Sequence, residues 1–385
     1  MGVALGGQLY LSFKVDGTEV PLGTSSLLNV FINQSCRQLV PVIKTAIPDM
    51  YGAFDKLVPI NDGSMIHVEM NDDRQPAFNG SSGFRAFGTP QRQPMAQFTQ
   101  YNIMGLLDAI PYVRGNPPGT IQGSSVDVMK NVAQAMNFNY TGKISTNDVM
   151  RWLPGRHTWG TFTKRAALHG WVGENSALVT AVDEQRQLHY IDVNDQFANA
   201  PVKAHIIYGG STAISGNVPT YAATEYKAVN RSGMLNNWHG YGSRITQHSV
   251  LDGVVNKFKT IQAMKVNNLI DMSKDVLGQL AGRARIDIPP IATGNTHENY
   301  IQARHHNTRM LSLYSQNIYV LVPATTGLNV FDMVEFESGA ENSSENSVNG
   351  LYSVTNMTRA LINSRYMEKI ELTNSGPANA NPSLV

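Results

Sequence analysis

The chain has 385 residues, of which 42% are hydrophobic but only 15% are charged, whereas about a quarter of an average globular protein is charged. This length favours two or three domains over a single core, and a weakly charged surface suits a subunit of a large assembly. The 30 basic and 29 acidic residues leave a formal net charge of +1 and form no long runs, which argues against a dedicated nucleic-acid-binding surface.

The first hundred residues have the pattern of β-strands. Apolar residues alternate over 9–15 before an Asp-Gly turn, which predicts a hairpin, and a second alternation covers 66–70. We therefore expect a small antiparallel barrel or sandwich in residues 1–116, to which strands at about 200–229 return.

The N-terminus lacks the basic region of a signal peptide. No apolar stretch reaches the roughly 18 residues that span a bilayer. We therefore expect a soluble protein made in a cytoplasm, without a stable membrane anchor.

Residues 117–199 are expected to form an α/β insert between two β-rich regions. Ser124 and Asp127 have the spacing of a capping box, which predicts a helix that begins there. A second helix is predicted over 159–169, with Gly170 directly after it. Two apolar runs, "ALVTAV" and "QLHYIDV", then predict a hairpin.

The remainder of the chain changes pattern twice. Residues 230–284 are expected to form a loop and a helical segment, because apolar residues recur at near-helical spacing over 254–280. Either one kinked helix or two short helices would satisfy that spacing. Clear alternation then predicts a second β-barrel over 285–373, and the Pro- and Ala-rich residues 374–385 are expected to form an extended arm.

Histidines are the first candidates for chemistry. His297, His305 and His306 form the densest cluster, but neighbouring histidines on a strand point to opposite faces, and no HExxH spacing accompanies them. Cys36 is the only cysteine, which leaves no internal disulfide and no cysteine metal site. We expect neither a metal nor a cofactor.

Carboxylates are the second candidates. Glu174, Asp183 and Glu184 could supply the pair that a glycosidase needs, but Asp183 and Glu184 fall in the predicted hairpin turn. A turn lacks the burial that tunes a catalytic pKa. The chain contains no GxSxG, GxxxxGK[ST] or GxGxxG motif. The four tryptophans are interpreted as core or subunit-contact anchors: Trp152, Trp159, Trp171 and Trp238. We therefore predict no catalytic, cofactor-binding or metal-binding residue, and no enzyme.

The order of elements in 117–195 carries a resemblance. The matching helix residues are Val128, Val132 and Ala133 in the first helix, and Phe162, Arg165, Ala167 and Gly170 in the second. The segment "NGLYSVTNMTRALINSRYMEKIELTNS" is similar to a closing barrel hairpin, and "FDKLVPINDGSMIHVEM" to the edge of a first barrel. Together these resemble the phage tail hub family, which includes baseplate hub proteins, late-control D proteins and the hub part of VgrG spikes.

The resemblance implies a β-rich α+β fold with two tube-type antiparallel β-barrels, an α/β insert and a helical segment. It implies a homotrimeric virion protein at the tail tip, assembled in the bacterial host cytoplasm, that joins a sixfold tail tube to a threefold central spike or fibre and lines part of the DNA ejection channel. Its partners would be tail tube or distal tail proteins, the spike and the tape measure protein, without specific nucleic-acid recognition. In this interpretation the turn Asp183–Arg186 is exposed and contacts a neighbouring tail protein. The alternatives are a tail-associated cell-wall hydrolase and a sixfold distal-tail or tube-end ring protein.

Overall fold

A computed structural model of the chain describes most of its length. The described residues are 3–5, 9–20, 29–49, 52, 54, 59–72, 79–173, 176–209, 218–230, 244–249, 255–260, 285–291, 296–297, 299–300, 303–304, 306–307, 316–339, 348–362 and 365–374. Among them, no helix is long and apolar enough to cross a membrane.

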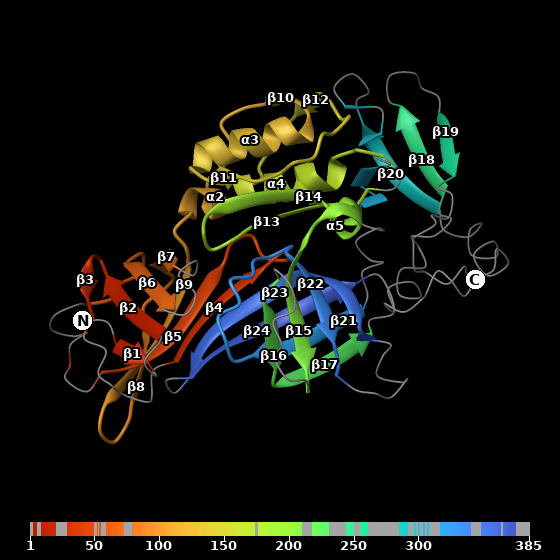
Figure 1. Cartoon of the computed structure of the whole chain (residues 1–385). Coiled ribbons are helices and arrows are strands. Elements are labelled where there is room, and N and C mark those ends of the chain that lie inside the picture. Colours follow the sequence, from red (N-terminus) through yellow and green to blue (C-terminus); the bar gives the residue numbers. More distant parts are fainter. Residues whose placement is uncertain are drawn as a thin grey trace.

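The N-terminal strands form a curled antiparallel sheet (Figure 1). Its order is β1, β2, β6, β7, β9, β5 and β4, with β3 beside β2 and β8 beside β9. The predicted alternation is confirmed, because Ile66 and Val68 are buried while His67 between them is half-buried. The strands are β1 (Val3–Leu5), β2 (Leu9–Val15), β3 (Thr18–Glu19), β4 (Asn29–Ser35), β5 (Val42–Asp49), β6 (Met65–Asp72), β7 (Asn79–Ala86), β8 (Gln91–Pro94) and β9 (Thr99–Leu107).

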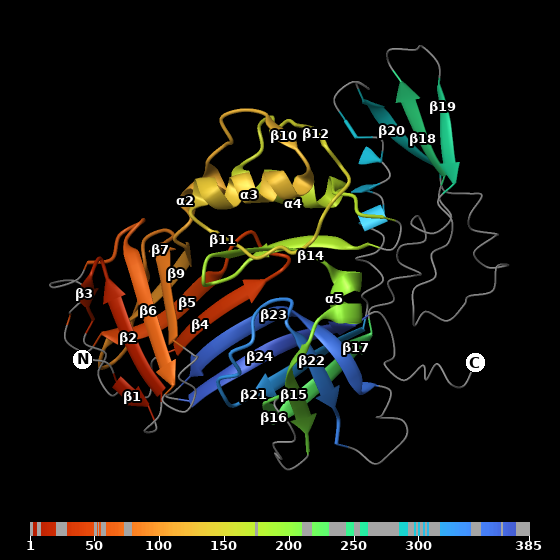
Figure 2. The same cartoon turned by 45° about the horizontal axis from the view of Figure 1, so that its top comes forward.

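The C-terminal strands close into a barrel (Figure 2). Its order is β16, β15, β22, β23, β24, β21 and β17. A single stretch, 220–230, pairs with β15 through its first half and with β21 through its second half, so both ends of the sheet meet in one piece of chain. The strands are β15 (Val202–Tyr208), β16 (Thr220–Ala223), β17 (Glu225–Asn230), β21 (Gln316–Val322), β22 (Met333–Glu337), β23 (Gly350–Ile362) and β24 (Arg365–Asn374).

The predicted β-rich fold class is therefore confirmed, with two differences in strand pairing. The strands expected at about 200–229 belong to the C-terminal barrel and not to the first, since β15 pairs with β22 and β17 pairs with β21. In addition, β15 runs parallel to both of its neighbours. Alternating hydrophobicity identifies a strand and its buried face but does not identify the strand beside it.

The two sheets are joined through one long strand. The first part of β23 pairs with β22, and beyond a bulge at residues 354–356 the same edge of β23 pairs with β4. A bulge leaves one residue unpaired and bends the strand. The chain thus forms one continuous 16-stranded sheet in which β23 belongs to both halves.

The α/β insert lies above the two sheets in the view of Figure 1. Both of its predicted helices are confirmed: Ser124 and Asp127 form a capping box at the start of the first, and Thr158 caps the second. The insert shares one hydrophobic core with the N-terminal sheet, whereas the C-terminal barrel has a core of its own. The elements are α2 (Ile110–Arg114), β10 (Ile121–Gly123), α3 (Ser125–Met136), β11 (Asn139–Tyr140), β12 (Met150–Trp152), α4 (Trp159–His169), β13 (Leu178–Val182), β14 (Gln187–Asp192) and α5 (Val193–Asn199).

The segment from residue 254, which was expected to be helical, contains β-strands where it is described. Strands β18 (Arg244–Ser249), β19 (Val255–Thr260) and β20 (Arg285–Ile291) form a small separate sheet. The loop predicted from residue 230 is therefore wrong over 244–249, and the helix predicted to begin at 254 is wrong over 255–260. The second barrel does not begin at 285, because β20 pairs with β18 and not with a barrel strand. Apolar residues a few positions apart fit a helix or a strand equally well over so short a run. The rest of that prediction, 261–284, and the arm after residue 374 lie outside the described residues.

Candidate functional site

The hairpin β13–β14 ends in a buried turn at the junction of the two sheets. Asp183 is 0% exposed and Glu184 is 3% exposed. The Asp183 carboxylate accepts hydrogen bonds from the backbone N–H groups of Gln185 and Gln187, at 2.9 and 2.8 Å, and from Nε2 of His189 at 2.9 Å. The prediction that Asp183–Arg186 is an exposed turn is therefore wrong for its two carboxylates.

The Glu184 carboxylate finds its partner in the C-terminal barrel. It forms an ion pair with the guanidinium of Arg359 on β23, and both side chains are almost fully buried. Arg359 also donates to the carbonyl of Leu328 at 3.0 Å and lies 3.6 Å from the carboxylate of Glu368. The backbone N–H of Glu184 donates to Gln34 on β4 at 3.3 Å, so the turn contacts both sheets where they meet.

Glu368 is held by several donors of its own. Its carboxylate accepts from the backbone N–H of Thr326 at 3.2 Å, from the Thr326 hydroxyl, and from the Tyr366 hydroxyl at 2.7 Å. A buried charge is strongly unfavourable unless it is paired and hydrogen-bonded. These partners make the buried group of Glu184, Arg359 and Glu368, here called the charge clamp, a means of fixing the insert to the barrel.

A cavity of about 210 Å³ lies between the insert and the C-terminal barrel, at the bulge where β23 changes partner. Apolar side chains line it from the insert and from the loop before β22, and hydroxyls line it from β23 and β24. Arg37, whose side chain is half exposed, reaches the buried Glu371 at 2.8 Å at the cavity's edge. The lining includes Val179, Val193, Phe197, Phe331, Thr355 and Cys36.

The histidines singled out by the sequence donate to backbone carbonyls. Nε2 of His297 lies 2.9 Å from the carbonyl of His169, and Nε2 of His306 lies 2.7 Å from that of Ser176. His169 itself stacks on Tyr300 and its Nδ1 lies 3.0 Å from the Tyr300 carbonyl. These contacts fasten the segment that contains His297 and His306 to the insert, while His305 lies outside the described residues.

Burial controls the protonation of His169 and His297. Desolvation lowers the pKa of His169 to about 4, and it also lowers the pKa of His297. Both rings are neutral at pH 7. No cluster of three or more potential metal ligands occurs among the residues that the structure describes.

A polar group that the sequence analysis missed lies inside the insert. Oγ of Ser125 lies 2.6 Å from the Asp148 carboxylate and 2.9 Å from the Tyr190 hydroxyl, and the same carboxylate accepts from the backbone N–H of Trp171 at 2.8 Å. Ser125, Asp148 and Tyr190 are all 0% exposed, so no substrate reaches them. Burial raises the pKa of Tyr190 well above its usual value, which keeps the phenol neutral as a hydrogen-bonding group.

The remaining candidates serve as packing groups where they are described. Trp152 and Trp171 are buried, and the indole N–H of Trp152 donates to the carbonyl of Gly123 at 2.9 Å. Trp159 packs partly buried against the core shared by the insert and the N-terminal sheet. Burial raises the pKa of the Cys36 thiol to about 11, which makes it a poor nucleophile. Glu174 and Trp238 lie outside the described residues.

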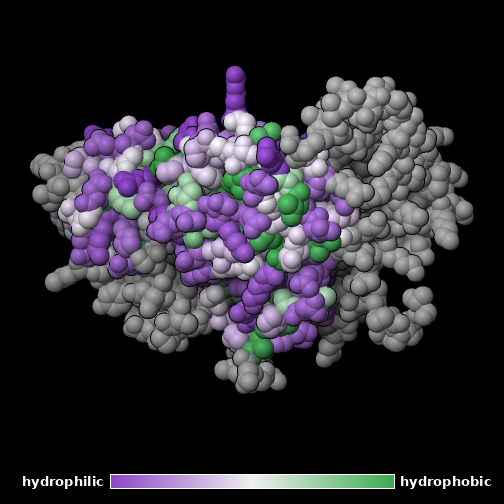
Figure 3. Space-filling model, turned by 90° about the horizontal axis from the view of Figure 1, so that it is seen from above, coloured by the Kyte–Doolittle hydropathy of each residue, from purple (hydrophilic) through white to green (hydrophobic). Residues whose placement is uncertain are grey.

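The surface carries apolar side chains among many polar ones. Figure 3 shows hydrophobic residues interspersed with hydrophilic ones on the face seen from above. Isolated exposed apolar residues are normal, but larger groups mark contact surfaces. The exposed large apolar side chains of the described residues are Phe87, Met95, Met104, Ile110, Val149, Leu153 and Val172.

Solved structures with this architecture span nearly the whole chain. The 43 kDa tail protein of prophage MuSo2 from Shewanella oneidensis matches with a TM-score of 0.57 at 12% identity, over 95% of this chain and 98% of that one. A tail protein from Neisseria meningitidis MC58 matches with a TM-score of 0.59 at 10% identity, over 96% and 98%. A type VI secretion system component from E. coli is less similar, with a TM-score of 0.49 at 8% identity, over 94% and 76%. No protein-family model matches the chain, and no curated protein matches its sequence. The resemblance stated from the sequence is confirmed at the level of the fold.

Proposed function

Because the chain has the fold of phage tail proteins, we propose that it is a structural subunit of a phage-type tail, and specifically a homotrimeric hub. In this role it joins a sixfold tail tube to a threefold central spike or fibre at the tail tip and lines part of the channel for DNA ejection. Tube or distal tail proteins, the spike and the tape measure protein are its partners. The hub is made and assembled in the host cytoplasm.

The observation that carries this proposal is the pair of curved sheets in one chain. The N-terminal sheet and the C-terminal barrel follow each other through the pairing of β4 with β23, so one subunit contributes two curved β-modules. Three copies around an axis then present six such modules. Closed rotational symmetry of this kind is the usual arrangement of soluble homo-oligomers.

We propose no catalytic role. The candidate carboxylates and histidines that the structure describes bind backbone groups or basic side chains, as Asp183, His169 and His306 do. A catalytic acid or base must reach a substrate proton. The hydrolase alternative predicts that Asp183→Asn abolishes wall degradation while leaving assembly intact. The structural proposal predicts instead that any loss of function accompanies a loss of stability.

The mass of the purified assembly and its averaged electron-microscopy view along the symmetry axis test the proposal together. Three copies with a sixfold-like ring of β-modules support the hub. Six copies support the distal-tail or tube-end ring, and a monomer at high protein concentration contradicts both.

A further inference from the structure

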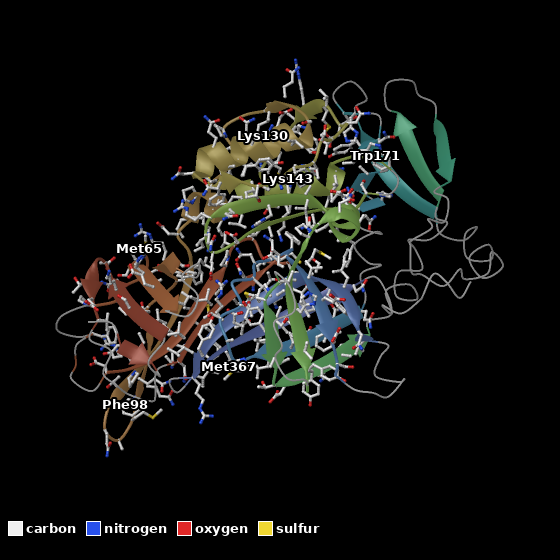
Figure 4. The ribbon with its side chains drawn as sticks, in the orientation of Figure 1. Met65, Phe98, Lys130, Lys143, Trp171 and Met367 are labelled. Carbon is white, nitrogen blue, oxygen red and sulfur yellow. The ribbon has the colours of Figure 1, made fainter. Side chains whose placement is uncertain are left out.

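A hairpin made of β8 and the first half of β9 protrudes from the N-terminal sheet. β8 pairs with the first half of β9, and the turn between them is closed by a hydrogen bond of 2.8 Å from the N–H of Met95 to the carbonyl of Phe98. Every residue over 91–97 is exposed, and Met95 is 41% exposed. Figure 4 shows Phe98 at the far end of this arm, beyond the edge of the sheet.

The composition of the hairpin is that of a contact element. Its two large apolar side chains, Met95 and Phe98, lie at the turn, and the segment "QRQPMAQFTQ" contains one charge, that of Arg92. The Arg92 guanidinium lies over the ring of Tyr101, 5.5 Å from its centroid. The turn residues 95–98 carry no charge, and an isolated subunit leaves Met95 exposed and Phe98 partly exposed to water.

The cavity at the β23 bulge has a volume and an apolar lining that suit the side chains of the hairpin turn. Its volume is about 210 Å³, and a cavity of roughly 150 Å³ lined by aliphatic and aromatic residues holds a benzene molecule. There is therefore room for a phenyl ring or a thioether side chain among Val179, Phe197 and Phe331. The hydroxyls of Thr355 and Thr373, which lie 2.8 Å apart, also line the cavity, and a hydroxyl oxygen can accept a hydrogen bond from a glutamine amide beside the tip.

The hairpin cannot fill the cavity of its own chain. Figures 1 and 2 place the N-terminal sheet at one end of the described part of the chain and α5, which lines the cavity, away from that end, and Figure 1 shows β8 at the end of the sheet. A contact between these two surfaces must join different copies. It is head-to-tail, because one copy contributes the hairpin and the other the cavity, and repeated contacts of this type form a ring when the rotation closes.

We propose that the Met95–Phe98 turn of one copy inserts into the cavity beside Thr355 of the next copy and holds neighbouring subunits together. The inference rests on the proposed self-assembly and names the surfaces through which it occurs. Each copy then uses its hairpin once and its cavity once, so every contact in the ring is equivalent.

The first test compares two double variants. Met95→Ser with Phe98→Ser removes the apolar tip, and the expected result is self-association weakened at least about tenfold, measured by light scattering over a dilution series. Val149→Ser with Leu153→Ser, which changes two exposed apolar residues on the insert, is the matched control and is expected to leave self-association unchanged. If both variants self-associate equally well, the proposal is contradicted.

The second test uses Cys36, the only cysteine of the chain, which lines the cavity. Wild-type protein is mixed with the variant Met95→Cys/Cys36→Ser and oxidised at alkaline pH, because the raised pKa of Cys36 slows its reaction. The expected product is a disulfide between Cys36 of one copy and the new cysteine of another, identified by peptide mass. The matched control partner is Val149→Cys/Cys36→Ser, for which no such product is expected.

The outcomes separate this inference from the proposed function. A trimer without the cross-link overturns the hairpin contact and leaves the hub intact. A six-copy ring with the cross-link supports the contact and overturns the hub. A monomer that forms no cross-link overturns both.

Discussion

Two buried carboxylates, those of Glu184 and Glu368, face the single guanidinium of Arg359. They come from the insert and from the barrel, so the arginine stabilises both elements at once. Its position follows an alternation that the sequence displays, since Met357, Arg359 and Leu361 all point inward. A charged residue at such an inward position indicates a buried partner, but the partner lies 175 residues away and periodicity cannot identify it.

Replacing Arg359 with Met should destabilise the protein strongly. The substitution leaves two carboxylates buried without a cation, a situation that costs about 3–5 kcal/mol. The free energy of unfolding, measured by denaturant titration, should fall by that amount. Lys14→Met, which removes one member of a half-exposed ion pair with Glu69, is the control and should cost about 1 kcal/mol or less. Similar effects for the two variants would contradict the role of the charge clamp.

The stability should also depend on pH through His169. Its pKa is lowered to about 4 in the folded protein from 6.5, so the unfolded chain binds a proton over an interval in which the folded protein does not. The contribution of His169 to the free energy of unfolding is therefore fully present above about pH 6.5 and is lost as the pH falls toward about 4. The loss attributable to His169 approaches about 3 kcal/mol.

His169→Gln provides the comparison for that pH dependence. The unfolding free energy of the wild type should fall more steeply between pH 6.5 and 4 than that of the variant. Some slope should remain in the variant, because the pKa of His297 is lowered too. Parallel curves for the two proteins would show that His169 does not contribute.

Among the helices and strands, those of the insert are the ones that sequence patterns predict best. The capping box at Ser124 and the end of α3 at Asn137, which has φ 53°, are local features and were predictable. Gly170 was also predicted to follow α4, but for a different reason. Its backbone is extended, with φ −65°, so the left-handed conformation expected of a C-terminal glycine is not what requires it.

The requirement at Gly170 is space, which makes Gly170→Ala a test of packing. An added Cβ would lie 2.9 Å from Cδ1 of Leu178 and 3.0 Å from Oγ of Ser125, and closer still to the Tyr190 hydroxyl. We expect a destabilisation of about 1–3 kcal/mol from overpacking, measured as a lower Tm. Gly173→Ala, where nothing lies within 4 Å, should change Tm little, and an equal effect there would contradict the explanation.

The hydrophobic cores of the insert, the N-terminal sheet and the C-terminal barrel are connected to one another. The N-terminal sheet and the insert share one core, the insert reaches the C-terminal barrel through the charge clamp, and β4 pairs with β23. The alternation of apolar residues correctly predicted a β-rich chain. It could not show which strands become neighbours, because β15 and β22 are more than a hundred residues apart, and such pairing depends on the complete fold.

This coupling predicts unfolding in a single step. Trp152, Trp159 and Trp171 all report on the insert, whereas far-UV circular dichroism reports mainly on the strands. In a Trp238→Phe background, the denaturant midpoints from fluorescence and from circular dichroism should coincide. Adding Arg359→Met should separate them, with the fluorescence transition at lower denaturant. Separate midpoints before that change would show that the insert unfolds on its own.

The double membership of β23 has a mechanical consequence. Seven residue pairs link β4 to β23 along one antiparallel ladder. A force applied along the strands loads all of those hydrogen bonds at once, in shear. A force applied perpendicular to the strands, within the sheet, would instead break them one after another. The β4–β23 ladder should thus resist stretching along the strands, and the insert, which contacts both halves, should restrain the sideways opening.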